Sequence, residues 1–255
     1  MSNWKVLLLL CTCTCASLML GAGSVPVLRP VMAKWFGADH EHRNELLVIL
    51  LAGTGVFYGL LLELTAAASY GNYTDAEQAV PMEATDVGTL NRDALAFPEP
   101  IRSRVASAVS DYDSFVINRE WPAQRHRRQV SGGQERINAI QLDLLTCQPQ
   151  TVADGILDQN TFGDFGKLVQ ARAQRQYQAA RSLQAPLWVV LLLGGVITVV
   201  LVAMVGVKTV RIHLVISGLY AIFLGMMLFF VVAFSSPFTG VVPISSETFQ
   251  QAQGA

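Results

Sequence analysis

The pattern of apolar positions along the chain shows four long runs with almost no charge, two toward each end of the sequence. Residues 6–28 and 46–69 form the first two runs, and residues 186–207 and 212–234 form the last two. At about 1.5 Å of rise per residue, each run is long enough as a helix to cross a hydrocarbon core of about 30 Å. Because a bilayer offers no water to backbone groups, the runs are predicted to be transmembrane helices.

The connections between these runs are short. Residues 29–45 join the first two runs, and residues 208–211 join the last two, with Lys208 and Arg211 in the turn. Short connections between helices are typical of antiparallel hairpins, so one hairpin is predicted at each end of the chain.

The chain between residues 70 and 185 is polar, and its apolar residues recur at the spacing of amphipathic helices. Four helices are predicted, marked by apolar positions within 76–94, 101–115, 137–144 and 165–183. Breaks are predicted at four sites that hold proline or paired glycine. These are Phe97-Pro98-Glu99-Pro100, Trp121-Pro122, Ser131-Gly132-Gly133 and Gln148-Pro149.

The predicted fold is therefore all-α, with four transmembrane helices as two hairpins and a helical extramembrane domain extending from them. Transmembrane helices 1 and 2 occupy residues 1–69, and the helical polar domain occupies 70–185. Transmembrane helices 3 and 4 occupy 186–235, and a polar C-terminal tail occupies 236–255.

The first run has a second interpretation, as a cleaved signal peptide. Lys5 would then provide the positive end, and Ala22-Gly23-Ser24 the small residues of a cleavage site. The uncharged stretch continues to Leu28, which is longer than the apolar part of most signal peptides, so a retained membrane helix is favoured.

Composition agrees with a membrane protein and argues against nucleic-acid binding. Charged residues make up 15% of the chain and hydrophobic residues 52%, whereas soluble domains carry about a quarter charged residues. The 18 lysines and arginines are balanced by 19 acidic residues, so the chain lacks the basic excess that phosphate backbones require. We expect the lipid bilayer, and no nucleic acid, among its partners.

The sequence offers no pattern for a metal, a cofactor or an enzyme. Cys11, Cys13 and Cys15 alternate with threonine inside the first run, and Cys147 stands alone. Residues two apart do not face each other on a helix, so these cysteines are expected to pack as small apolar side chains. The same spacing argues against a metal site in Asp39-His40-Glu41-His42. Phosphate loops, nucleophile elbows and zincin motifs are absent from the sequence.

A set of short motifs resembles a known family. Tyr112 precedes Glu120-Trp121-Pro122, Pro186-Leu187-Trp188 opens the third run, and Pro237-Phe238-Thr239-Gly240 follows the fourth. In this order and spacing they resemble the uncharacterised bacterial membrane proteins called bestrophin-like, over nearly the whole chain from Leu46 to Gln250. The family-motif residues are Tyr112, Glu120, Trp121, Pro122, Pro237, Phe238 and Gly240.

The resemblance implies an oligomeric ion channel, because bestrophins are oligomeric anion channels. Two bestrophin features are missing from this sequence. The second run has Phe57 but no repeated isoleucine-phenylalanine-proline neck, and the polar domain has no acidic run resembling the calcium clasp. Calcium gating is therefore not expected. Another departure is Ser235-Ser236, at a place where many members are expected to carry a charged pair.

The second run is the candidate pore helix. Gly55, Gly59, Glu63 and Ala67 recur every four residues, so they share one face of the helix. Glycines allow close helix contact in a membrane, and an acid at this depth is expected to face protein or water. The alternative is that Glu63, about a turn and a half from the end of the run, reaches the interface or is neutralised by burial.

Two further features have both a functional and a structural interpretation. Tyr220, Phe223, Met227, Phe230 and Phe234 form a stripe in the fourth run that could line a hydrophobic gate or simply pack between helices. Arg125, Arg127 and Arg128 belong to a basic segment that could contact anions or lipid head groups, or lie in solvent. The structural interpretation is the commoner one for both features.

Two functions from different classes remain open on the sequence. The first is a homo-oligomeric ion channel, for anions by the resemblance, with its pore lined by the second run. The second is a non-conducting accessory or scaffold subunit bound to other membrane proteins. The location expected for either is a bacterial inner membrane, with polar domain and termini in the cytoplasm, because the resemblance implies this and unpaired Cys147 suits a reducing compartment.

Overall fold

The computed structural model describes residues 3–36, 40–247 and 249, and every regular element among them is helical. The long helices are α1 (Asn3–Phe36), α2 (His40–Ala94), α7 (Ala185–Met204) and α8 (Val210–Phe234). All four are long and apolar enough to cross a membrane. The prediction of an all-α fold with four such helices is confirmed. Its physical reason is that an uncharged run in lipid can form all its backbone hydrogen bonds within one segment only as a helix.

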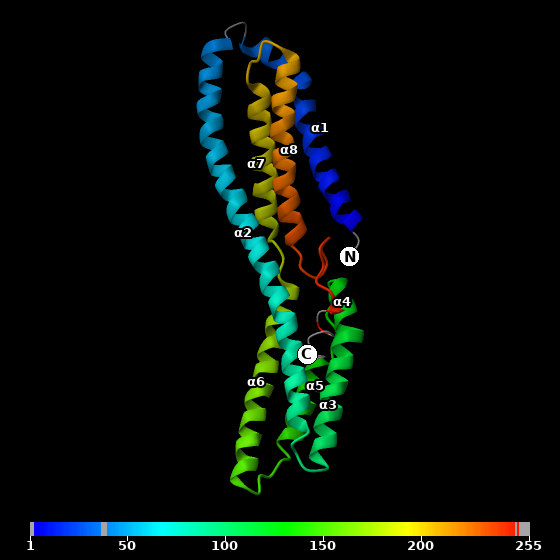
Figure 1. Cartoon of the computed structure of the whole chain (residues 1–255). Coiled ribbons are helices and arrows are strands. Elements are labelled where there is room, and N and C mark those ends of the chain that lie inside the picture. Colours follow the sequence, from blue (N-terminus) through cyan, green and yellow to red (C-terminus); the bar gives the residue numbers. More distant parts are fainter. Residues whose placement is uncertain (1–2, 37–39, 248, 250–255) are drawn as a thin grey trace. The chain divides into compact units, whose positions relative to one another are not determined.

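The chain divides into two compact units (Figure 1). The first, the membrane unit, contains residues 1–71 and 182–235, and the second, the polar unit, contains residues 72–181 and 236–255. Helix α2 is one uninterrupted helix that begins in the membrane unit and ends in the polar unit.

In the membrane unit, α1 packs mainly against α8 and α7 (Figure 1). Its approach to α8 is so close that a Cβ atom on Gly225 would lie 2.8 Å from Thr14 Cα. A Cβ atom on Gly21 would lie 2.5 Å from that of Ala221. Small residues at such contacts let the two backbones meet, which is how membrane helices gain packing energy without a hydrophobic drive.

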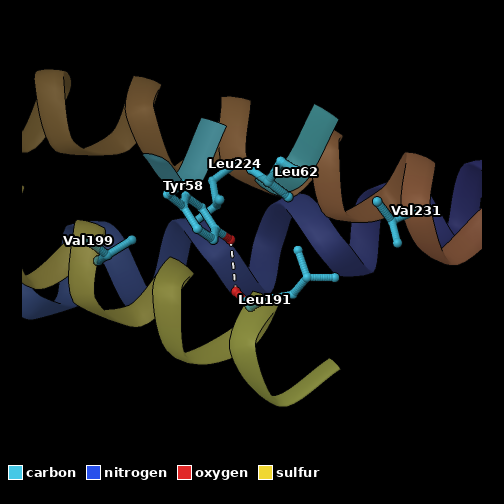
Figure 2. Packing of buried hydrophobic residues seen from close by; sticks show 6 residues of the cluster. All are labelled: Tyr58, Leu62, Leu191, Val199, Leu224 and Val231. Atoms are coloured by element: carbon cyan, nitrogen blue, oxygen red, sulfur yellow. Dashed lines mark hydrogen bonds between the residues drawn. The ribbon is translucent and has the colours of Figure 1, made fainter. Parts of the chain in front are cut away.

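Helix α2 is held to the second hairpin by Tyr58. Its ring lies against Gly194, where a Cβ atom would be 2.5 Å from Tyr58 Cδ2, and its hydroxyl donates a 2.9 Å hydrogen bond to the carbonyl of Leu191. Figure 2 shows this ring within the apolar core of the unit. The core residues are Tyr58, Leu62, Leu191, Val199, Leu224 and Val231.

A second link joins α2 to the turn between α7 and α8. The side-chain amide of Asn44 both donates to and accepts from the backbone of Gly206, at 2.8 Å in each case. Arg29 Nη2 donates to the carbonyl of Lys208 at 3.4 Å. The two short connections of the membrane unit therefore lie together.

The polar unit contains the last part of α2 and the helices α3 (Ile101–Phe115), α4 (Trp121–Arg125), α5 (Gly133–Leu144) and α6 (Val152–Ala180). A π-helical segment, η1 (Val116–Glu120), connects α3 to α4.

Two predicted boundaries in this unit differ from the structure. The predicted break at Trp121-Pro122 is wrong, because α3, η1 and α4 follow one another without interruption. Pro122 lies in the first turn of α4, where a helix tolerates the missing N–H group. Helix α6 begins earlier than its apolar pattern indicates, at a capping box in which Thr151 and Asp154 exchange side-chain and backbone hydrogen bonds.

Candidate functional site

The predicted pore face of α2 is open in the membrane unit. Glu63, Gly59 and Ala67 are exposed and Gly55 is half-buried. A Cβ atom added at Gly55 or Gly59 would meet no other atom within 4 Å. The four residues therefore form a face that the described part of the chain leaves largely uncovered.

The predicted stripe on α8 is divided between several environments. Tyr220 and Met227 pack against the apolar core of the membrane unit, whereas Phe223 is 55% exposed. Phe230 and Phe234 lie side by side, with ring centroids 4.9 Å apart, and both contact Tyr70 of α2. Most of the stripe thus has packing partners within its own unit.

The predicted basic segment contains one arginine with defined partners. Arg127 has a left-handed backbone with φ of 55°, and its guanidinium donates to Ser236 Oγ at 3.1 Å and Thr239 Oγ1 at 3.4 Å. Arg125 and Arg128 are exposed. Arg127 therefore binds the segment that follows α8, and the other two remain open to solvent.

Three of the family-motif residues meet in the interior of the polar unit. Glu120, at the end of η1, accepts hydrogen bonds from Nη2 and Nη1 of Arg172, at 2.5 and 3.0 Å. Its second oxygen also accepts from Arg175 Nη2 at 2.7 Å. Tyr112 lies beside this pair and accepts a 3.2 Å hydrogen bond from Arg172. Trp121 has its ring 5.9 Å from the guanidinium carbon of Arg175.

Glu83 of α2 completes this buried charge cluster. It accepts hydrogen bonds from Nε and Nη2 of Arg175, the latter at 3.0 Å, and from the hydroxyl of Tyr112. Glu83 and Arg175 have no exposed surface at all. We use "charge cluster" below for five residues, Glu83, Tyr112, Glu120, Arg172 and Arg175.

The charges of this cluster balance, since it holds two carboxylates and two guanidinium groups. Burial by itself would raise the pKa of Glu120, but hydrogen bonds and charge from Arg172 and Arg175 outweigh it and lower that pKa. Burial and the nearby Glu83 raise the pKa of Tyr112 well above its ordinary value. Near neutral pH Glu120 is therefore ionised, and Tyr112 keeps its proton.

Local backbone features bring these side chains together. Gly132 caps the start of α5 with a left-handed φ of 106°, and the first helical residue, Gly133, lies directly against the ion pair. A Cβ atom at Gly133 would be 2.0 Å from Arg172 Nη2 and 2.8 Å from Glu120 Oε1. The glycine pair that the sequence marks as a break therefore also makes room for the charge cluster.

Trp121 joins the charge cluster to the segment that follows α8. Its ring contacts those of Phe238 and Phe249, with centroid distances of 5.7 and 6.2 Å. The turn of this segment is closed by Gly240, whose N–H donates to the Ser236 carbonyl at 2.8 Å. The family motif that contains Trp121 and the one after α8 that contains Phe238 are thus close in space.

Sequence analysis missed Glu83, Arg172 and Arg175 as site residues. A signal for them exists, because each falls on the apolar face of a predicted helix. Glu83 lies between Val80 and Val87, and Arg172 continues the face marked by Leu168. Charges on a core-facing stripe are rarely buried unless paired, so an acid and two arginines in such positions indicate partners for one another.

Metal-binding chemistry has no site in the part of the chain that the structure describes, where no three histidine, cysteine or acidic side chains gather around one point. Asp39 and the side chains of His40, Glu41 and His42 lie outside the described residues. The four cysteines are free.

Comparison with known proteins identifies relatives of this fold. Residues 4–249 match the family model described as the Bestrophin-like domain. A crystal structure of a membrane protein in a substituted form is similar with a TM-score of 0.70 at 10% identity, over 96% of each chain. A mutant of a bacterial bestrophin homologue from Klebsiella pneumoniae is similar with a TM-score of 0.66 at 11% identity, also over 96% of each chain. No curated protein sequence matches.

Proposed function

The chain belongs to the Bestrophin-like family, and from this premise we propose that it forms a homo-oligomeric ion channel that conducts anions through a pore lined by α2. The family supplies the class of function, and the four apolar helices supply the membrane location. The choice of α2 as the pore helix rests on the residues of its open face.

The observation that carries this proposal is the exposure of Glu63 on an apolar membrane helix. A carboxyl group at this depth is costly against lipid, so it is expected to face water or protein. Gly55, Gly59 and Ala67 lie along the same face, and none of them carries a side chain larger than a methyl group. A small, partly polar face of this kind suits a helix that borders a shared wet space.

The pore requires several copies of the chain. Helix α1 packs against α7 and α8, and Tyr58 holds α2 to α7. This packing leaves little room for a water-filled path inside one copy. A closed ring of identical copies would place the α2 faces around a common axis. The expected partners are therefore lipid and further copies of this chain.

The ring of Glu63 side chains bears on the choice of ion. Identical acids around an axis repel one another when they are ionised. If they are neutral or paired, the pore can pass anions, and if they stay ionised, they favour cations. The family favours the first outcome.

The proposal is tested by reversal potentials in a salt gradient, compared between the native protein and Glu63→Gln. A change in selectivity, conductance or pH response places Glu63 at the pore. Glu77→Gln is the control, because Glu77 is also an exposed acid of α2 but belongs to the polar unit. Identical currents from the native and Glu63→Gln proteins would remove α2's open face from the conduction path.

The alternative is a non-conducting scaffold or accessory subunit. Large apolar side chains on α2, such as Phe57 at 77% and Leu64 at 70% exposure, offer surfaces that another membrane protein could cover as well as lipid. Counting copies in the purified particle separates the two functions. A symmetric ring of this chain alone supports the channel, and a single copy bound to other proteins supports the scaffold.

A further inference from the structure

The charge cluster gathers chain segments attached to three of the four membrane helices. Glu83 belongs to α2, which contains the second membrane helix. Arg172 and Arg175 belong to α6, which ends at Ala180, shortly before α7 begins. The segment that follows α8 reaches the cluster through its contacts with Trp121.

The link between α2 and α6 consists of charged groups with defined geometry. Arg175 donates to both oxygens of Glu83 with two of its nitrogens, and both side chains are fully buried. An apolar contact could slide by a fraction of an ångström at little cost, whereas breaking such a pair leaves an unpaired charge in the interior. The pair therefore fixes the register of α2 against α6 within the polar unit.

The link to the segment after α8 passes through aromatic rings. Trp121 follows Glu120 directly in the chain, and its ring contacts both the guanidinium group of Arg175 and the ring of Phe238. Arg127 adds hydrogen bonds to Ser236 and Thr239 in the same segment. Any displacement of this segment would therefore shift Trp121 and, through it, the side chains that hold α2 to α6.

We propose that the charge cluster is a positioning site for the channel. The cluster holds the segments attached to membrane helices two, three and four in one arrangement, and it thereby sets the fraction of time that the pore is open. This inference rests on the proposed function and adds a controlling element to it. Its residues touch no permeating ion and act through α2, α6 and the segment after α8.

The test compares single-channel records of the native protein with Glu83→Gln and Phe238→Ala. The control is Asp111→Asn, which breaks the 2.8 Å pair between exposed Asp111 and half-buried Arg136 in the same polar unit. Helix content and particle mass are measured for every variant. We expect both test variants to assemble and to change the open fraction on the order of fivefold or more, with the control unchanged.

Two further variants keep the test decisive. Glu83→Asp retains the charge and is expected to recover part of the native open fraction, which a loss of general packing would not explain. If Glu83→Gln does not assemble, Phe238→Ala and Glu83→Asp carry the test, because neither removes a buried charge. Native currents with unchanged open fractions in the assembled variants would overturn this inference. Absence of native current would instead overturn the proposed function.

Discussion

Glu120 shows how one residue type can be stabilised in a protein interior. It is almost completely buried, yet it stays ionised because Arg172, Arg175 and Gln176 all donate hydrogen bonds to it. Its carboxylate would be expensive to bury without these partners. Glu120 is the last residue of the π-helical segment η1, and such segments often occur at functional sites.

Acid should destabilise the polar unit through this residue. The pKa of Glu120 is lower in the folded chain than its ordinary value, so its contribution to stability is present at neutral pH and is lost as pH falls through this lowered pKa. Thermal unfolding followed by circular dichroism should show a fall in Tm on acidification that is smaller in Glu120→Gln. Glu135→Gln, which changes an exposed acid of α5, should retain the native slope. Equal slopes in the native and Glu120→Gln proteins would contradict this prediction.

Replacing Gly133 by alanine should lower stability. The new Cβ atom would overlap Arg172 Nη2, and displacing that side chain weakens its pair with Glu120, for an expected loss of about 1–3 kcal/mol in the free energy of unfolding. Gly163→Ala in α6 is the matched control, because nothing lies within 4 Å and alanine is the better helix former. If Gly133→Ala has the same free energy of unfolding as the native protein, the ion pair has room to move and the prediction is wrong.

The site residues that sequence reasoning could predict are those with unusual local signatures. Tyr112, Glu120 and Trp121 belong to short motifs, and the contact of Trp121 with Phe238 follows from the fold. Glu83 and Arg175 lie about ninety positions apart, and only the packing of α2 against α6 brings them together. Charge on an apolar stripe indicates burial, but it does not identify which distant residue is the partner.

At the scale of elements, the four apolar helices were predictable because lipid permits so few alternatives to a continuous helix. The polar helices were harder. Trp121-Pro122 has the composition of a break, yet α4 continues from η1, since proline costs little in a first helical turn. The start of α6 carries a readable signal in Thr151 and Asp154, which apolar periodicity alone does not use.

Close contact between α2 helices of neighbouring copies should depend on Gly55 and Gly59. Among the described residues, nothing lies within 4 Å of a Cβ atom at either position, so replacing both with leucine should let the monomer fold while the assembly dissociates. Particle mass from light scattering measures this. Gly23→Leu on α1, another position with nothing within 4 Å, should leave the mass unchanged. An intact assembly in the double variant would place the interface elsewhere.

At the scale of the whole molecule, the proposed channel implies one orientation of the chain in the membrane, whereas the count of positive charges does not decide between the two. The positive-inside rule is nearly tied, since five cations lie in the short connections and four lie near the opposite membrane ends. The first group is Arg29, Lys34, Arg43, Lys208 and Arg211, and the second is Lys5, Arg172, Arg175 and Arg181. We propose a cytoplasmic polar unit and cytoplasmic termini. Cys147, the one cysteine outside the membrane helices, should then resist an impermeant maleimide in intact spheroplasts and react after lysis. Cys147→Ser identifies the labelled site, and labelling before lysis would reverse the orientation.

The central claim is that copies of this chain conduct ions, and current through purified protein tests it most directly. The native oligomer, verified by particle mass, is inserted into a planar bilayer with unequal chloride salt on the two sides. The account predicts discrete currents whose reversal potential lies toward the value for chloride. Bilayers that contain the verified oligomer and stay electrically silent would contradict it and favour the scaffold.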